Sequence, residues 1–250
     1  LAGGLSAAVL LPEIFALQMT ASGDVNFPKT VTSYFSIFDM IARHLPIVET
    51  EIGLDHWPNL YCGVAVLMFF ILYLLCRKVS AKEKAVYCVM LLFFFASFSF
   101  NILNFIWHGF HYPNSLPCRQ SYIYIFLVLF ACYRAYMYLG ETPWKQVTGA
   151  FAGAVVFVLM AQKLVTQDHF HFIVYYVAIL FLALYLGAIA LYQKGSRYYY
   201  PALFYALAVV SLEAAVNTAV TSVTTTSRTA YTDDNQAVEA LVDSVQPNDS

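Results

Sequence analysis

Charged side chains are scarce in this 250-residue sequence, which holds 13 Lys and Arg, 15 Asp and Glu, and 11% charged residues in all. A soluble domain carries about a quarter of charged residues, because it must present a polar surface to water. Hydrophobic residues instead make up 60% of the chain and aromatic residues 17%. The net charge of −2, without any basic stripe, argues against a nucleic-acid partner. The composition predicts a protein whose main partner is the lipid bilayer.

The sequence also lacks any CxxC pair among its five cysteines. An odd and scattered set is neither a disulfide framework nor a zinc motif. Most of these cysteines lie in or beside apolar stretches, where a thiol behaves as a small hydrophobic group. We expect structural roles for all of them. The sequence supports no metal ion and no other cofactor, although a divalent metal remains an open alternative.

The first residues contain no initiator Met, no basic region and no cleavage site, so they do not form a signal peptide. The chain is already apolar from Leu1 to Leu11. We therefore expect a fragment of a larger protein, with more of the chain upstream.

Long apolar runs are abundant. A spanning helix needs about 20 mostly apolar residues, and a chain in lipid must satisfy every backbone polar group internally, which favours helices. We predict an all-α fold, a polytopic transmembrane helix bundle over residues 1–220. Its roughly seven spans are Leu1–Gln18, Leu60–Cys76, Ala85–Phe105, Ser121–Leu139, Val147–Val165, Phe172–Gln193 and Pro201–Val220.

The loops predict an orientation. Residues 77–84, 134–146 and 193–200 concentrate Lys and Arg, and such loops face the cytoplasm. The loop 106–120 and the C-terminal tail then lie on the extracellular side of a multi-pass membrane protein. The tail, residues 221–250, is polar, with a weak helical pattern at Gln236–Val242. It is predicted to be an external tail or the start of a truncated extracellular domain.

One external segment has a helical pattern of its own. Within Phe35–Leu45 the apolar residues fall on one helix face, with Asp39 and Arg43 opposite them. We predict a short interfacial helix on the outer membrane surface. The alternative is a loop packed on the bundle.

The loop 106–120 concentrates polar groups at the membrane boundary, where they are costly unless they have partners or a task. His108 and His111 share one face if the helix continues, and Asn114 lies between two prolines. Arg119 precedes the next span, where a guanidinium and a helix N-terminus both favour an anion. We interpret the loop as a cradle for a lipid-linked phosphate. The simpler alternatives are interfacial histidines, and an Arg119 that pairs with a neighbouring acid.

Glu213 lies in the last span, one helical turn before Asn217. A buried Glu there either pairs with a cation such as Arg119 or serves substrate binding. We include it among the candidate substrate-binding residues. Asp24, Asp55 and His56 are possible general bases by position alone, because no motif surrounds them.

Two stretches resemble the YfhO family of bacterial multi-span proteins. One is the pattern Leu103-Asn104, Trp107-His108-Gly109-Phe110-His111, Pro113-Asn114, Leu116-Pro117, Arg119 and Ser121. The other is Pro58-Asn59-Leu60-Tyr61-Cys62-Gly63, which opens a span. Cys118 stands where the family pattern has Tyr, a departure that we expect to leave phosphate binding intact.

The resemblance implies the later half of a GT-C type membrane glycosyltransferase. Such an enzyme takes a sugar from a polyprenyl-phosphate donor on the outer face of the bacterial cell membrane. It passes the sugar to a cell-envelope polymer, for this family lipoteichoic acid. The catalytic acid of such enzymes lies in the first external loop, which is expected upstream of this chain. Two alternatives use the same surface: a transporter or flippase of polyprenyl-linked sugars, and a non-catalytic membrane scaffold.

Overall fold

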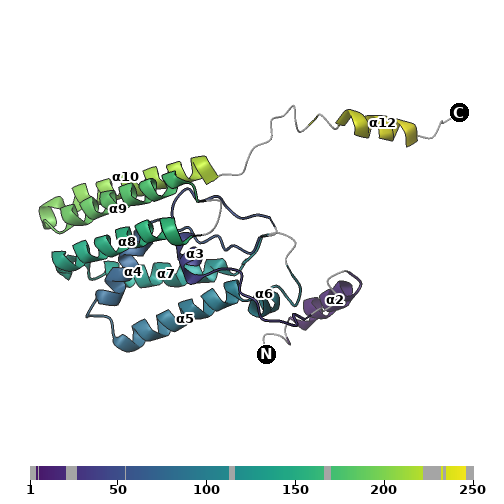
Figure 1. Ribbon diagram of the computed structural model, residues 1–250, viewed down its shortest axis with the longest axis horizontal. Helices are drawn as coiled ribbons and strands as arrows, with labels where there is room; N and C mark the ends of the chain where they lie inside the picture. Colours follow the sequence, from purple (N-terminus) through teal and green to yellow (C-terminus); the bar gives the residue numbers. More distant parts are fainter. Residues whose placement is uncertain are drawn as a thin grey trace.

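The computed structural model describes residues 4, 6–20, 27–53, 55–112, 116–165, 170–221, 232 and 235–245. Its named elements are all helical, which confirms the predicted all-α class. Labelled as in Figure 1, they are α2 (Ala7–Gln18), α3 (Ile37–Ala42), α4 (Ala65–Leu75), α5 (Ala81–Ser99), α6 (Asn101–Trp107), α7 (Ser121–Tyr136), η2 (Leu139–Glu141), α8 (Trp144–Leu164), α9 (Phe172–Tyr192), η3 (Ser196–Tyr198), α10 (Tyr199–Thr221) and α12 (Asn235–Val245).

Within the described residues, three stretches are long and apolar enough to cross a membrane on their own. They are α8, α9 and the stretch Ser196–Thr221, which contains η3 and α10. They correspond to the last three predicted spans. Three further apolar helices, in α2, α4 and α7, are shorter than a full crossing. The predicted count of about seven spans is therefore confirmed for three, and the other four remain predictions.

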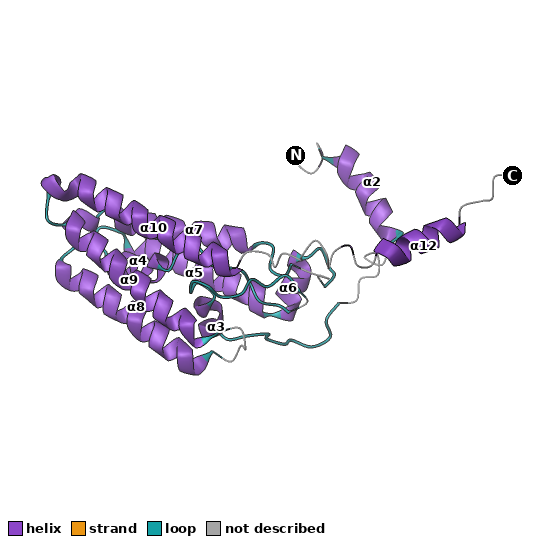
Figure 2. Cartoon of the chain, turned by 90° about the horizontal axis from the view of Figure 1, so that it is seen from above, coloured by secondary structure: helices purple, strands orange, loops and turns teal. Residues whose placement is uncertain are grey.

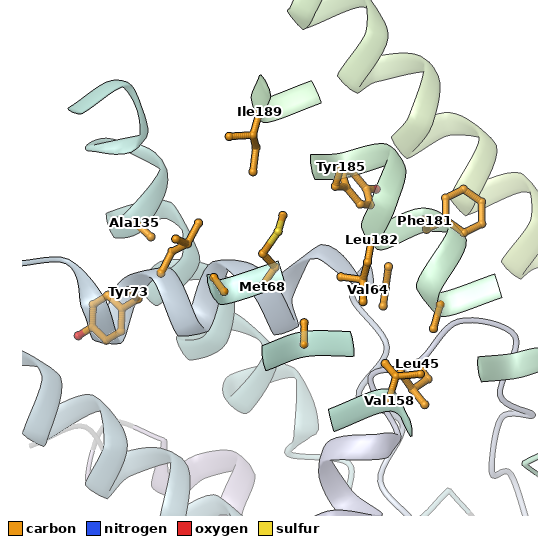
Figure 3. Packing of buried hydrophobic residues seen from close by; sticks show 14 of the residues in the cluster. Leu45, Val64, Met68, Tyr73, Ala135, Val158, Phe181, Leu182, Tyr185 and Ile189 are labelled. Atoms are coloured by element: carbon orange, nitrogen blue, oxygen red, sulfur yellow. The ribbon is translucent and has the colours of Figure 1, made fainter. Parts of the chain in front are cut away.

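Helix α4 occupies the middle of the bundle and packs against α7, α8 and α9 (Figures 1 and 2). Its Met68 is fully buried and meets α9 residues such as Leu182 in one hydrophobic core (Figure 3). Helix α10 packs on α9, and α5 packs on α7. On α10 the apolar side chains Phe204 and Leu207 remain exposed, as expected of a face covered by lipid.

Small residues let the central helices approach closely. On α8, Ala150, Ala154 and Ala161 repeat at helical spacing and are fully buried. Gly153 lies in the same helix, and an added Cβ there would come within 3.2 Å of the Ile71 side chain of α4. Small side chains at such positions are typical of helices that associate within membranes, where close backbone packing drives association.

The three basic turns meet at one end of the bundle. Lys78 of the first turn pairs with Glu141 of the second, with 3.2 Å between Nζ and Oε2. The Gln193 amide of the third turn donates to the Leu139 and Thr142 carbonyls of the second, at 2.8 and 2.9 Å. The three basic turns therefore lie together, as the predicted orientation requires. The side of the membrane that they face remains a prediction.

The predicted single span Ala85–Phe105 is wrong in its continuity, because the helix breaks at Phe100. Phe100 has extended backbone angles and separates α5 from α6. Residues 30–35 run beside the break: the Tyr34 N–H donates to the Ser99 carbonyl at 2.9 Å, and the Asn101 N–H donates to the Thr32 carbonyl at 3.1 Å. These bonds supply partners for backbone groups that the break removes from the helical pattern.

The predicted interfacial helix forms as α3, but its predicted orientation is wrong. Asp39 and Arg43 are both buried, at 4% exposure each. Asp39 forms a capping box with Ser36 at the start of the helix. Arg43 donates from Nε to the Pro58 carbonyl at 3.1 Å and from Nη2 to the Asn59 amide oxygen at 2.9 Å. The segment therefore packs on the bundle, because these partners on residues 36–59 satisfy its polar groups away from water.

His44, just after α3, predicts a pH-dependent stability. Burial lowers the pKa of His44 to about 4, whereas a histidine in the unfolded chain has a pKa of about 6.5. The unfolded state therefore binds more protons between these values, so stability falls as pH falls from about 6.5 towards 4. Between pH 7 and pH 5 this amounts to about 2 kcal/mol. In detergent, the free energy of unfolding of His44→Leu should therefore depend less on pH than that of the wild type. If the two proteins show the same pH dependence, the prediction is contradicted.

Helices α2 and α12 stand apart from the bundle in both views (Figures 1 and 2). Helix α12 confirms the helical pattern predicted at Gln236–Val242. Most of the tail between α10 and α12 lies outside the described residues, so the nature of the predicted tail or truncated domain remains open.

Candidate functional site

The loop with the predicted site begins where α6 ends. His108 caps the helix, and the next two residues have left-handed backbone angles, with φ of 71° at Gly109 and 64° at Phe110. The Phe110 N–H donates to the Phe105 carbonyl at 3.0 Å, which closes the helix end. The chain reverses here, so it turns back towards the start of α7.

The second half of the loop is conformationally strained. Leu116 and Cys118 have φ values of 52° and 53°, a region that L-residues other than glycine rarely adopt. Cys118 is fully buried, and its thiol donates to the His56 carbonyl at 3.5 Å. The Leu116 N–H donates to the Ile52 carbonyl. Such strain persists where surrounding contacts impose it, and it is commonest at functional sites.

Beside these turns lies a half-open cavity of about 440 Å³, which we call the histidine cavity. It brings together three predicted residues, namely His108, His111 and Arg119. The other lining residues are Trp107, Gln120, Tyr122 and Ile123. Asn114 lies outside the described residues. Its lining residues belong to the end of α6, the loop after it and the start of α7, which lie at the end of the bundle opposite the three basic turns (Figure 1).

His108 is a neutral hydrogen-bond acceptor in this cavity. It is buried, and its Nδ1–H donates to the Asn104 carbonyl at 2.7 Å. Burial lowers the pKa of His108, and the nearby Arg119 and His111 act in the same direction. The imidazole is therefore neutral at pH 7, with its lone pair on Nε2. Among the described residues Nε2 has no hydrogen-bond partner.

Gln120 is a second buried polar group at the cavity, and the sequence reasoning missed it. It is 6% exposed and caps the start of α7. Its Nε2 also lacks a hydrogen-bond partner within the described part of the chain. A buried donor without a partner costs about 1–3 kcal/mol, so such groups call for an explanation, and a ligand is one. The sequence did offer one signal for Gln120, because it lies directly after Arg119 in the predicted phosphate-binding loop.

Arg119 supplies the positive charge of the cavity. Its side chain is exposed, and its Nε lies 3.4 Å from the Leu116 carbonyl oxygen. The prediction that a helix starts beside it is confirmed, because α7 begins at Ser121. The guanidinium and the N–H groups of the first turn of α7 together favour an anion. His111, exposed on the other wall, adds a further hydrogen-bonding group.

Glu213 does not belong to this cavity. It is 2% exposed on α10, where its carboxylate accepts hydrogen bonds from the hydroxyl groups of Tyr61 and Tyr185 and from the Val64 N–H. The expectation that Glu213 pairs with a cation such as Arg119 is wrong, because two tyrosines and a backbone amide bind its oxygens. Sequence reasoning missed both tyrosines, since neither stands near Glu213 in the chain.

No three His, Cys, Asp or Glu side chains come together as metal ligands in the described residues. All five cysteines are free thiols. Burial lowers the pKa of His56, with Asp55 acting against this shift and His108 adding to it. The His56 ring stacks on Tyr34 with 3.7 Å between centroids. Two nearby histidines are fewer than the three protein ligands of a typical catalytic zinc site.

The comparisons with known proteins identify one family. The profile described as "Bacterial membrane protein YfhO" matches residues 1–250 of this chain. Neither a curated protein nor a solved structure matches it.

Proposed function

The chain belongs to the YfhO family of bacterial membrane proteins, and from this membership and the histidine cavity we propose that it forms part of a membrane glycosyltransferase. The donor in this proposal is a sugar linked to polyprenyl phosphate, and the acceptor is a cell-envelope polymer such as lipoteichoic acid. The observation that carries the proposal is one cavity with a cationic Arg119 beside buried nitrogens of His108 and Gln120 that have no hydrogen-bond partner among the described residues.

The transfer requires two kinds of assistance. An acceptor hydroxyl oxygen forms a bond to the anomeric carbon of the sugar, while the bond from that carbon to the phosphate oxygen breaks. The bonding electrons leave with the polyprenyl phosphate, and the hydroxyl proton passes to a base. The departing phosphate gains negative charge, so a preorganised cation and donors accelerate the step. A positioned base assists the proton transfer.

Arg119 and Gln120 suit the first task. The guanidinium can bind two phosphate oxygens at once, and the Gln120 Nε2 can donate a further hydrogen bond. A phosphate oxygen would accept a hydrogen bond from the buried Gln120 Nε2, which has no partner among the described residues. This bond would offset part of the free-energy cost of burying that amide.

His108 suits a different task from the one first expected. A neutral imidazole supplies no positive charge to a phosphate. Its unpartnered Nε2 can instead accept a hydrogen bond from a hydroxyl group of the sugar or the acceptor. We therefore propose that His108 positions that hydroxyl group. Through the same hydrogen bond, His108 could also accept the hydroxyl proton as a general base.

The test is transfer of a radiolabelled sugar from polyprenyl phosphate to lipoteichoic acid by the purified full-length protein that contains this chain, reconstituted in proteoliposomes. We expect transfer by the wild type and about tenfold less by His108→Gln, the loss that one hydrogen bond of about 1.4 kcal/mol in the transition state would give. The residual activity of this variant should lose the pH dependence that titration of His108 gives the wild type below pH 6.5. A well-folded wild type that transfers no sugar from any polyprenyl-phosphate hexose would overturn the proposal.

A further inference from the structure

A second cavity, of about 580 Å³, lies between α4, α7, α9 and α10. Along α10 its lining runs from Tyr199 to Ala214, a length of roughly 22 Å at 1.5 Å per residue. Small and aliphatic side chains such as Ala188, Ala206 and Val210 form much of its wall. The shape is that of a long apolar channel beside a helix face that lipid covers. We call it the tyrosine–carboxylate cavity.

One end of this cavity holds a carboxylate, while Tyr192 and Tyr199 are among the residues that line the other end. Glu213 lies at the carboxylate end with Tyr61 and Tyr185, near the loop that precedes α4. Figure 3 shows Tyr185 of α9 and Val64 at the start of α4 facing the same region of the core. Oε1 of Glu213 accepts from the Tyr61 hydroxyl at 2.9 Å and from the Val64 N–H at 2.7 Å, and Oε2 accepts from Tyr185. Because a carboxylate offers about four acceptor sites, one remains.

The charge in this cavity has no counter-ion. Within the described lining, Glu213 is the single charged side chain, and Lys, Arg and His are absent from that lining. A buried charge is costly unless it is paired, and an ionisable residue among membrane helices marks a functional site by default. Tyrosines are frequent in the lining, and the electron-rich face of a tyrosine ring attracts cations.

We propose that the tyrosine–carboxylate cavity binds an amphiphile with an ammonium head group and one alkyl chain. The head lies against Glu213 beside Tyr61 and Tyr185, and the chain extends along α10 past Ala206. The charge of this site is opposite to that of the histidine cavity, which attracts anions through Arg119. The two cavities therefore bind different ligands, and the proposal does not depend on sugar transfer.

The test uses two photoreactive probes with the same diazirine-bearing dodecyl chain, one ending in trimethylammonium and the other in a hydroxyl group. Labelling of α10 in the purified protein is read by mass spectrometry. For Glu213→Gln we expect at least tenfold less labelling by the ammonium probe and less than twofold change with the alcohol probe. Glu141→Gln, at an exposed acid in the basic turns, should change neither.

Two results would overturn the proposal. One is equal labelling by both probes in the wild type, which would mean that the cavity binds any lipid chain. The other is unchanged labelling by the ammonium probe in Glu213→Gln. Ala206→Phe keeps the bonds of Glu213 and fills the apolar part of the cavity, so it tests the site even where Glu213→Gln fails to fold. It should reduce labelling by both probes, and undiminished labelling would place the chain elsewhere.

Discussion

Replacing Arg119 by alanine is expected to lower the rate of sugar transfer about 100-fold. The loss of one preorganised donor to a developing negative charge costs about 10²–10³ in rate. Arg119 is the arginine of the histidine cavity. Arg119→Lys keeps the charge and loses the planar fork, so its loss should be smaller, about tenfold, on the scale of one hydrogen bond to a charged group. The exposed side chain predicts little effect on folding.

The measurement combines transfer in proteoliposomes with binding of farnesyl phosphate, a short polyprenyl phosphate. Arg119→Ala should weaken that binding and slow the transfer, because the guanidinium contacts the phosphate before and during the reaction. Arg197→Ala, in η3 at the other end of the bundle, is the matched control and should change neither. Equal rates and affinities for the wild type and Arg119→Ala would remove Arg119 from the site.

Asn59→Ala is expected to destabilise the protein by about 3 kcal/mol, because it breaks a buried polar network. The Asn59 amide oxygen accepts from Arg43 Nη2 and from the Glu51 N–H, both at 2.9 Å, and its Nδ2 donates to the Glu51 carbonyl at 2.8 Å. Alanine removes all three bonds. It leaves the guanidinium of Arg43, which is 4% exposed, with the Pro58 carbonyl as its remaining described partner.

A chain of this length shifts its melting temperature by about 2–4 °C per kcal/mol, so Asn59→Ala should melt about 6–12 °C below the wild type in detergent. Asn59→Asp keeps an oxygen for both donors and should lose less. Asn235→Ala, on exposed α12, should stay within about 0.5 kcal/mol of the wild type. If Asn59→Ala and Asn235→Ala have the same melting temperature, the Asn59 network contributes no stability.

The stretch 58–63 carries part of the family pattern but does not line the histidine cavity. Its polar side chains instead bind two other parts of the structure. Asn59 binds Arg43 on one side, and Tyr61 binds Glu213 on the other. Ile47, whose φ is 55°, donates its N–H to the Asn217 amide oxygen of α10 at 2.8 Å. Helix α10 therefore anchors the segment 47–64, part of which bonds to the histidine loop, so Glu213 and Asn217 also hold the structure together.

The sequence by itself determined the class of this protein. Low charge, long apolar runs and the placement of Lys and Arg require no knowledge of contacts, because the bilayer acts on composition and span length alone. The start of α7 near Arg119 and the grouping of His108 and His111 with it were also predictable, since they depend on residues close in the chain.

Only the tertiary structure decided the features that depend on distant segments. The helix breaks at Phe100 because residues 30–35 supply backbone hydrogen-bond partners there. The apolar run 85–105 contains no signal for these partners. Arg43 turned inward because Pro58 and Asn59 satisfy it, against the outward position that helical periodicity predicted. Glu213 separated from Arg119 because Tyr61 and Tyr185 reach it from two other elements. Each case has one physical reason: a buried polar group goes where its hydrogen bonds are, and a single sequence does not reveal those partners.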